Sequence, residues 1–446
     1  MRGVRSLVAL VVVFGGLLAY LYFVDAGKPV TPEGTDARDK VFSVESDKVS
    51  ELRVSSSTGE TTTLKKEKDG WQMLSPIQAR VDESEVSGIT SNLSTLEIQS
   101  VVDENPSDVQ PYGLKDPRIE VAFKAEGDKE FKGVRLGSKT PTGGDLYAQR
   151  LNEKQVFLVP AYLESTFDRK PFDLREKNLL AFDRDKVDRL ELAYDKTKIE
   201  LAKSGTDWRI VSPIQAAADF SAVEGLVTRL QSAQMKSLVE ESAGGLKQYG
   251  LAAPTATATV GAGSTRATLA FGKTAEGTDV YARDVSRPLV ATVGDDLLKD
   301  VQKTVADLRR KDVFEFRSYS ANRVEVTRGA ETVVFEKVKG TGSDATEKWR
   351  RVQPSAGDVD QAKMESFLSA LTGLRAQSFA DPKTPTGLDS PIVVVTAKYD
   401  EGKKEERVRF GRAGDDVFAA RGDETGAARL DKAAFDEAMK ALDALK

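Results

Sequence analysis

One nine-residue pattern occurs twice in this chain, 137 residues apart, and this spacing restricts the fold more than any other feature. The sequence reads WQMLSPIQA from Trp71 and WRIVSPIQA from Trp208, and a third tryptophan follows at Trp349. Such a period is far above the roughly 20–50 residues of a solenoid repeat. Each copy is therefore predicted to be a whole domain with its own core, so that the chain holds three such domains in tandem.

A second motif, Y-G-L-x-x-P, recurs at the same spacing. Its aligned residues are Gly113, Gly250 and Gly387, followed by Pro117, Pro254 and Pro391. We interpret the glycine as a positive-φ turn residue and the proline as the start of an edge strand, rather than as ligand-binding groups. For the three tryptophans we expect core packing, with a glycan-stacking surface as the alternative.

Each copy also contains one helix with a recognisable start. Asp82 is expected to cap it in the first copy, with Glu85 three residues later completing a capping box. Asp219 and Asp360 stand at the same place in the other copies. Short strands separated by turn residues surround this helix. The fold class predicted is α+β: three tandem, mostly antiparallel β domains, each with one main capped helix and a short closing helix, preceded by a single transmembrane helix.

The junctions between the copies contain neither glycine nor proline. The first reads DLREKNLLAF from Asp173, and the second reads DLRRKDVFEF from Asp307. The predicted organisation is an N-terminal anchor, a flexible tether and three repeat domains, at 1–26, 27–40, 41–180, 181–314 and 315–446.

The N-terminus carries an uncharged apolar run from Leu7 to Val24. At 1.5 Å per residue this run makes a helix of about 27 Å, close to the roughly 30 Å of bilayer hydrocarbon. The residues expected to anchor it in the membrane are Leu7, Leu10, Phe14, Leu18, Leu21 and Val24. The sequence therefore predicts one membrane span.

Charge around the run sets its orientation. Arg2 and Arg5 precede it and Asp25 follows, which predicts an N-terminus in the cytoplasm and the bulk of the chain across the membrane. In a bacterium this corresponds to an inner-membrane protein with a periplasmic body. A cleaved signal peptide is the alternative, although its apolar region is normally only about 7–15 residues long.

The composition excludes several classes of site. The chain contains no Cys and no His, which removes thiolate and imidazole metal ligands, cysteine nucleophiles and triads with an imidazole base. A net charge of −5 without a basic block argues against nucleic acid. Adjacent acids such as Asp295–Asp296 and Asp415–Asp416 are interpreted as solvated surface. No catalytic residue, cofactor, metal site or small-molecule substrate is predicted.

The order of these motifs resembles the family known as domain of unknown function 4340. The shared pattern is a tryptophan with a following proline, the capped helix, Y-G-L-x-x-P, a strand ending in Leu-Gly or Phe-Gly, and D-L-R-x-K. The resemblance covers 41–446; the third copy departs at Thr386 and at the VQPSAG that begins at Val352. It implies a bacterial protein with one N-terminal span and an extracytoplasmic region, often encoded beside gliding-motility-type ABC transporters, and no agreed catalytic residues.

Two functional interpretations follow. The first is a non-catalytic, membrane-anchored periplasmic protein that docks other proteins, an ABC-transporter complex in particular, because repeated modules raise effective concentration. The second is a cell-wall or polysaccharide-associated factor, either a carbohydrate binder or a carboxylate-dependent hydrolase. Clustered exposed aromatic residues, or a cleft with two suitably spaced carboxylates, would favour the second.

Overall fold

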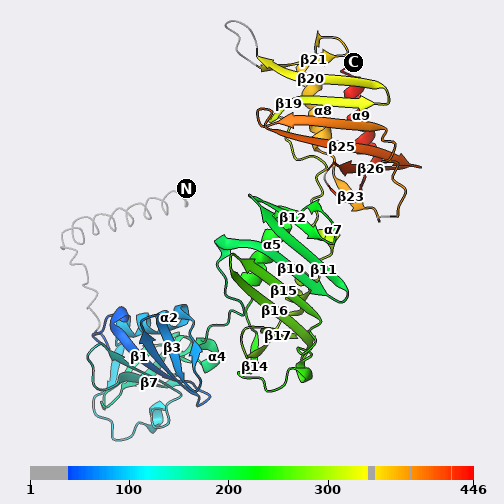
Figure 1. Cartoon of the computed structure of the whole chain (residues 1–446). Coiled ribbons are helices and arrows are strands. Elements are labelled where there is room, and N and C mark those ends of the chain that lie inside the picture. Colours follow the sequence, from blue (N-terminus) through cyan, green and yellow to red (C-terminus); the bar gives the residue numbers. More distant parts are fainter. Residues whose placement is uncertain (1–38, 340–346, 382, 423, 446) are drawn as a thin grey trace, which may run out of the picture. The chain divides into compact units, whose positions relative to one another are not determined.

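The computed structural model describes residues 39–446 except 340–346, 382, 423 and 446 (Figure 1). The expected anchor, with Leu7 to Val24, and all but the end of the expected tether lie outside the described residues. Among the residues that the structure describes, no helix has the length and apolar composition needed to cross a membrane. The chain forms two compact units that divide between Glu176 and Lys177.

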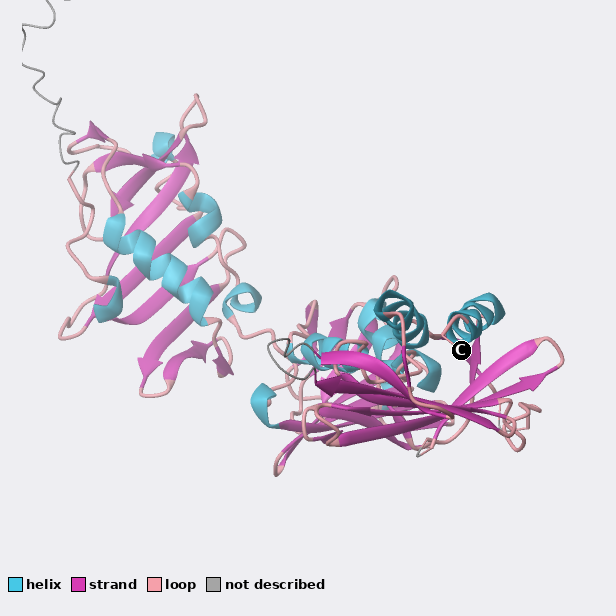
Figure 2. Cartoon of the chain, turned by 90° about the horizontal axis from the view of Figure 1, so that it is seen from above, coloured by secondary structure: helices cyan, strands magenta, loops and turns pink. Residues whose placement is uncertain are grey.

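The first unit holds one domain with a nine-stranded antiparallel sheet in the order β4-β3-β2-β1-β6-β7-β8-β9-β5. Its elements are η2 (Ser46–Lys48), β1 (Val49–Ser55), β2 (Thr61–Glu67), β3 (Gly70–Ser75), β4 (Ala79–Arg80), α2 (Glu83–Thr95), β5 (Ser100–Asp103), η3 (Gln110–Tyr112), β6 (Ile119–Ala125), β7 (Lys132–Lys139), β8 (Asp145–Arg150), β9 (Val156–Pro160), α3 (Leu163–Phe167) and α4 (Pro171–Leu174). Figure 2 shows α2 lying across one face of this sheet.

The second unit holds two further domains, each with a nine-stranded sheet of the same strand order. The second domain comprises η4 (Arg184–Lys186), β10 (Val187–Tyr194), β11 (Thr197–Ser204), β12 (Asp207–Ser212), β13 (Ala216–Ala217), α5 (Phe220–Gln231), β14 (Ser237–Glu240), η5 (Lys247–Tyr249), β15 (Ala256–Ala262), β16 (Thr265–Thr274), β17 (Val280–Asp284), β18 (Val290–Val293), α6 (Asp295–Val301) and α7 (Val305–Leu308). The third comprises β19 (Ala321–Arg328), β20 (Glu331–Lys339), β21 (Glu347–Gln353), β22 (Gly357–Asp358), α8 (Gln361–Thr372), β23 (Ala376–Phe379), β24 (Val393–Tyr399), β25 (Lys404–Ala413), β26 (Asp416–Arg421), β27 (Ala428–Leu430) and α9 (Lys432–Asp443).

Three antiparallel sheets of one topology confirm the tandem β repeats that the sequence predicts. The closing helices differ between copies: the first two domains end in two short helices, whereas the third ends in the 12-residue helix α9. Apolar residues of α9 such as Phe435 and Leu442 complete the third core beside Phe367 of α8.

The tryptophans occupy matching places in the three cores. Trp71, Trp208 and Trp349 lie near the starts of β3, β12 and β21, with only 7%, 1% and 7% of their surface exposed. Each is tied to the main helix of its domain. The backbone N–H groups of Trp71 and Trp349 donate to the side chains of Glu83 and Gln361, both at 2.8 Å, and the indole of Trp208 donates to Glu224 at 2.7 Å. Rings buried in this way leave no surface for stacking a glycan.

The motif glycines fold a loop against a strand. Gly113, Gly250 and Gly387 have φ values of 67°, 72° and 67°, a region that favours glycine. A second set of glycines, Gly137 in β7, Gly272 in β16 and Gly411 in β25, lies directly under the carbonyl oxygens of Tyr112, Tyr249 and Thr386, where a Cβ would collide. Ring pairs Tyr112–Tyr147 and Tyr249–Tyr281, 5.1 and 5.0 Å apart, cover this contact in two copies. The motif is therefore a packing device.

The proline prediction is wrong in one respect. Pro117, Pro254 and Pro391 precede β6, β15 and β24, which lie in the middle of their sheets and not at an edge. A central strand tolerates them because each strand begins two residues later, so the missing N–H removes no bond between strands.

The helix starts agree with the predicted caps but not with the capping box. The side chains of Asp82, Asp219 and Asp360 accept hydrogen bonds from the first backbone N–H groups of α2, α5 and α8. Glu85, however, pairs with Arg169 at 3.1 Å, and the Asp82 N–H donates to the Leu174 carbonyl at 2.9 Å. The Asp82 N–H, which would donate to the Glu85 side chain in a capping box, therefore donates to a backbone carbonyl far away in the sequence instead.

Two glycine substitutions in the second domain are expected to change stability in opposite directions. Gly272→Ala places a methyl group against the Tyr249 carbonyl and should lower the free energy of unfolding by about 2 kcal/mol. Gly225→Ala, in the middle of α5 with open space around it, should raise that free energy by about 0.5–1 kcal/mol. Urea denaturation of both variants measures the difference; equal effects would contradict the packing role of Gly272.

Candidate functional site

Within the second unit, one extended segment forms isolated bridges beside the edge strands of two sheets. Its first half pairs with the edge of the second sheet: the Asp219 N–H donates to Leu308 O at 2.8 Å, and the Arg310 N–H donates to Ala217 O at 3.0 Å. Its second half pairs with the third domain: the Val313 N–H donates to Leu374 O at 3.1 Å, and the Ala376 N–H donates to Lys311 O at 2.7 Å. We call the extended residues 309–313, which follow α7, the linker strand. Bridges at both ends of this segment are consistent with a junction that contains no glycine or proline.

Buried ion pairs hold the linker strand to the third domain. Arg309 pairs with Glu424 at 3.2 Å, and their side chains are only 6% and 7% exposed. Arg421 lies 3.4 Å from Glu424 and 3.0 Å from Glu315, and Glu315 lies 3.5 Å from Arg310. Such pairs are costly to break because the remaining charge stays buried. We call these five residues the junction network.

The repeated phrase takes part in the same junction. The Thr425 N–H donates to Gln215 O at 2.8 Å, and the Ala217 N–H donates to the Glu424 carboxylate at 3.2 Å. The end of WRIVSPIQA therefore contacts the third domain, while its tryptophan stays in the core of the second. In this copy, the first residue of the repeated sequence packs in the core of the second domain, and its last residues contact the third domain.

Environment shifts the pKa values of two junction carboxylates in opposite directions. Burial favours the neutral form of Glu315, but the hydrogen bond from Arg421 and the charge of Arg310 outweigh it, so its pKa lies below the ordinary 4.5. Burial raises the pKa of Glu406 even though its carboxylate accepts the backbone N–H groups of Phe316 and Glu315. Glu315 is thus ionised at neutral pH.

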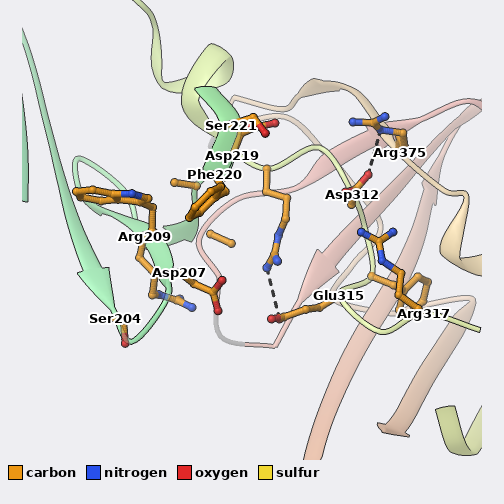
Figure 3. A pocket seen from close by; sticks show the side chains of 15 residues that line it. Ser204, Asp207, Arg209, Asp219, Phe220, Ser221, Asp312, Glu315, Arg317 and Arg375 are labelled. Carbon is orange, nitrogen blue, oxygen red and sulfur yellow. Dashed lines mark ion pairs between the residues drawn. The ribbon is translucent and has the colours of Figure 1, made fainter. Parts of the chain in front are cut away.

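A cleft of about 470 Å³ opens beside the linker strand (Figure 3). Phe220, at the start of α5, lines one side with 52% of its surface exposed. Asp312, Glu315 and Arg317 come from the linker strand and the segment after it, and line the other side. Arg317 has no ion-pair partner among the residues described. The cleft therefore offers an apolar ring and charged groups on facing walls.

Most carboxylates of the cleft are already engaged. Asp219 caps α5 by accepting the Ala222 N–H at 2.9 Å, Asp312 pairs with Arg375 at 3.1 Å, and Glu315 belongs to the junction network. An acid whose pKa is lowered does not supply the proton that glycoside cleavage needs. No group of metal-ligating side chains occurs in the described part of the chain. The arrangement suits recognition of a charged partner better than catalysis.

Sequence reasoning singled out Trp208 and Asp219 among the residues that line this cleft, the first as a core residue and the second as a helix cap. The D-L-R-x-K motif indicated where the junction lies. It could not indicate which carboxylate pairs with its arginine, because Glu424 lies 115 positions from Arg309. The adjacent acids behave as surface groups: Asp295, Asp415 and Asp416 pair with Lys299, Lys432 and Arg429 at 2.7, 2.7 and 2.6 Å, and Asp296 pairs with Arg229.

Comparisons with known proteins place the chain in a family. The model of the family described as "Domain of unknown function (DUF4340)" matches residues 71–207 and 208–391, so each match begins at one of the repeated tryptophans. The chain belongs to this family. Among curated proteins no relative matches.

One similar solved structure is the "Crystal structure of DNA polymerase sliding clamp from Pseudomonas aeruginosa with ligand". The two chains are 8% identical, the similarity covers 87% of this chain and 92% of that one, and the TM-score is 0.17.

Replacing Glu315 should make the stability of the second unit less sensitive to acid. Since its folded pKa is lowered, Glu315 stabilises the native state above its unfolded value of 4.5, and this contribution is lost as the pH falls through the folded pKa. Glu315→Gln should cost about 1 kcal/mol at neutral pH, discounted for partial exposure, and progressively less as the pH falls below 4.5. Urea denaturation across this range checks it, with Glu401→Gln, 81% exposed, as the control. Parallel curves for Glu315→Gln and the native protein would contradict it.

Proposed function

We propose that this protein is a non-catalytic docking component of the bacterial cell envelope. In this proposal one N-terminal span holds it in the inner membrane, its three domains lie in the periplasm, and its partner is a membrane protein complex of the ABC-transporter type. The observation that carries the docking role is the junction cleft, where ion pairs within the protein hold Asp312 and Glu315 opposite the exposed Phe220 ring. Fixed charge beside an exposed aromatic ring is typical of a recognition surface.

Support for the anchor comes from the sequence. The run from Leu7 to Val24 has the length and apolar character of a span, and Arg2 and Arg5 lie on the side that the positive-inside rule assigns to the cytoplasm. A periplasmic location is also consistent with a chain that contains no cysteine.

Support for docking over a polysaccharide-associated role comes from the surface. Of the exposed aromatic residues Tyr162, Phe220 and Tyr319, Phe220 alone lines the cleft, whereas a glycan platform needs several exposed rings grouped together. The carboxylates of the cleft that form ion pairs or caps lack the freedom expected of an acid–base pair. The carbohydrate-related alternative therefore has less support.

Charge placed in the apolar run should release the protein from the membrane. Arg at both Leu10 and Leu18 costs about 2.5–3.5 kcal/mol for each substitution near the centre of a span. After alkaline extraction, the L10R/L18R variant should appear in the supernatant, while the native chain and the L10I/L18I control should stay in the pellet. A native protein whose intact mass lacks residues 1–26 would instead show a cleaved signal peptide.

Truncation of Phe220 should weaken capture of the partner. Native protein purified from membranes in mild detergent is expected to bring ABC-transporter subunits with it, identified by mass spectrometry. Phe220→Ala should reduce their recovery about tenfold or more, since a central aromatic contact is typically worth 1–2 kcal/mol or more. Tyr162→Ala, which removes a ring 61% exposed in the first domain, is the matched control. Recovery of the bait alone would contradict docking whatever the anchoring result.

A further inference from the structure

A second, much smaller cavity lies beside the linker strand. Its volume is about 20 Å³, enough for one water molecule or one ion of similar size. Arg309, Arg310 and Arg421 of the junction network line it together with apolar groups that include Phe379 and Val408. The guanidinium of Arg309 lies 4.3 Å from the centre of the Phe379 ring.

Several N–H donors at this cavity have no acceptor. The Nε groups of Arg309, Arg310 and Arg421 and the Nη1 of Arg421 are buried without a hydrogen-bond partner. Glu424 lies 3.4 Å from the Arg421 Nε but does not accept a hydrogen bond from it. Buried donors of this kind are rare in native proteins and usually indicate a bound water or ion. These four groups belong to three arginines that line one cavity, and an acceptor inside the cavity is the candidate partner for them.

The charge of the lining favours an anion as that acceptor. Four lining side chains are positive, Arg309, Arg310, Lys311 and Arg421, and two are negative, Asp312 and Glu424. Asp312 is also paired with Arg375, outside the cavity. The volume matches a single halide-sized ion better than phosphate or a carboxylate on a chain. Apolar walls suit a weakly hydrated ion such as chloride.

We propose that this cavity binds one small inorganic anion, chloride under physiological conditions. The bound ion accepts hydrogen bonds from the linker-strand arginines and from Arg421 of the third domain, and so ties the second and third domains together. A ligand that binds only the folded junction stabilises it by mass action. Chloride concentration then sets the stability of the second unit independently of membrane attachment or docking.

The test is thermal unfolding of the full-length protein in detergent, with sodium chloride exchanged for sodium gluconate at constant ionic strength. Gluconate screens charge equally but does not fit a cavity of about 20 Å³. Chloride at tenfold its dissociation constant should raise the midpoint by roughly 3–5 °C, and bromide should do the same. Equal midpoints in chloride and gluconate would overturn the proposal.

A pair of conservative variants localises the effect. Arg310→Lys keeps a positive charge beside Glu315 but removes the Nε donor, so the chloride-dependent shift should fall by at least half. Arg317→Lys, in the cleft but not at the cavity, should keep the full shift. If Arg310→Lys does not fold, crystals of the native protein grown in bromide decide the matter. An anomalous peak among Arg309, Arg310 and Arg421 supports the proposal, and a water there without anomalous signal overturns it.

Discussion

Pairing of linker segments with sheet edges is the interaction on which the rest of this structure depends. An open sheet exposes unpaired backbone groups at both edges, and these must be covered. In the second unit, one linker strand covers an edge of the second sheet and continues into the third domain. The first domain uses the same device: the Val41 N–H donates to Leu96 O at 2.7 Å, and the Asp39 carbonyl accepts from Ile98 at 2.9 Å. Asp39 and Lys40, expected in the tether, are therefore part of the folded domain.

Each domain also holds its incoming segment with side chains from its later strands or the loops after them, but the chemistry differs. Arg150 donates to Val41 O at 2.8 Å in the first domain, and Arg287 donates to Asn178 O at 3.0 Å in the second. In the third, carboxylates take this role, because Glu406 accepts the Phe316 N–H at 2.8 Å and Glu424 pairs with Arg309. The backbone pairing of the incoming segment is thus repeated between domains, whereas the charged side chains that hold this segment differ from copy to copy.

This division explains what the sequence could predict. Trp208, Gly250 and the Asp219 cap act through neighbours in sequence or through a core that each copy rebuilds, so repetition identifies them. The Pro254 prediction failed because strand order is a nonlocal property: a residue before a strand does not indicate whether that strand is central. The junction network could not be predicted from the sequence for the same reason. Arg309, Arg310 and Glu315 lie in the junction segment itself, whereas Arg421 ends β26 and Glu424 follows it, more than 100 positions later in the sequence.

The free-energy cost of burying the charges of the junction network indicates that the network contributes specificity of pairing more than net stability. A buried ion pair usually adds little net stability over apolar packing, since desolvation offsets most of the attraction, but a mispaired one is strongly unfavourable. Slippage of the linker strand by one residue would turn Arg309 away from Glu424 and reverse the faces of its neighbours, because side chains alternate along a strand. Backbone hydrogen bonds alone would permit such a slip. The charged groups therefore select one register, and that register determines the walls of the cleft beside Phe220.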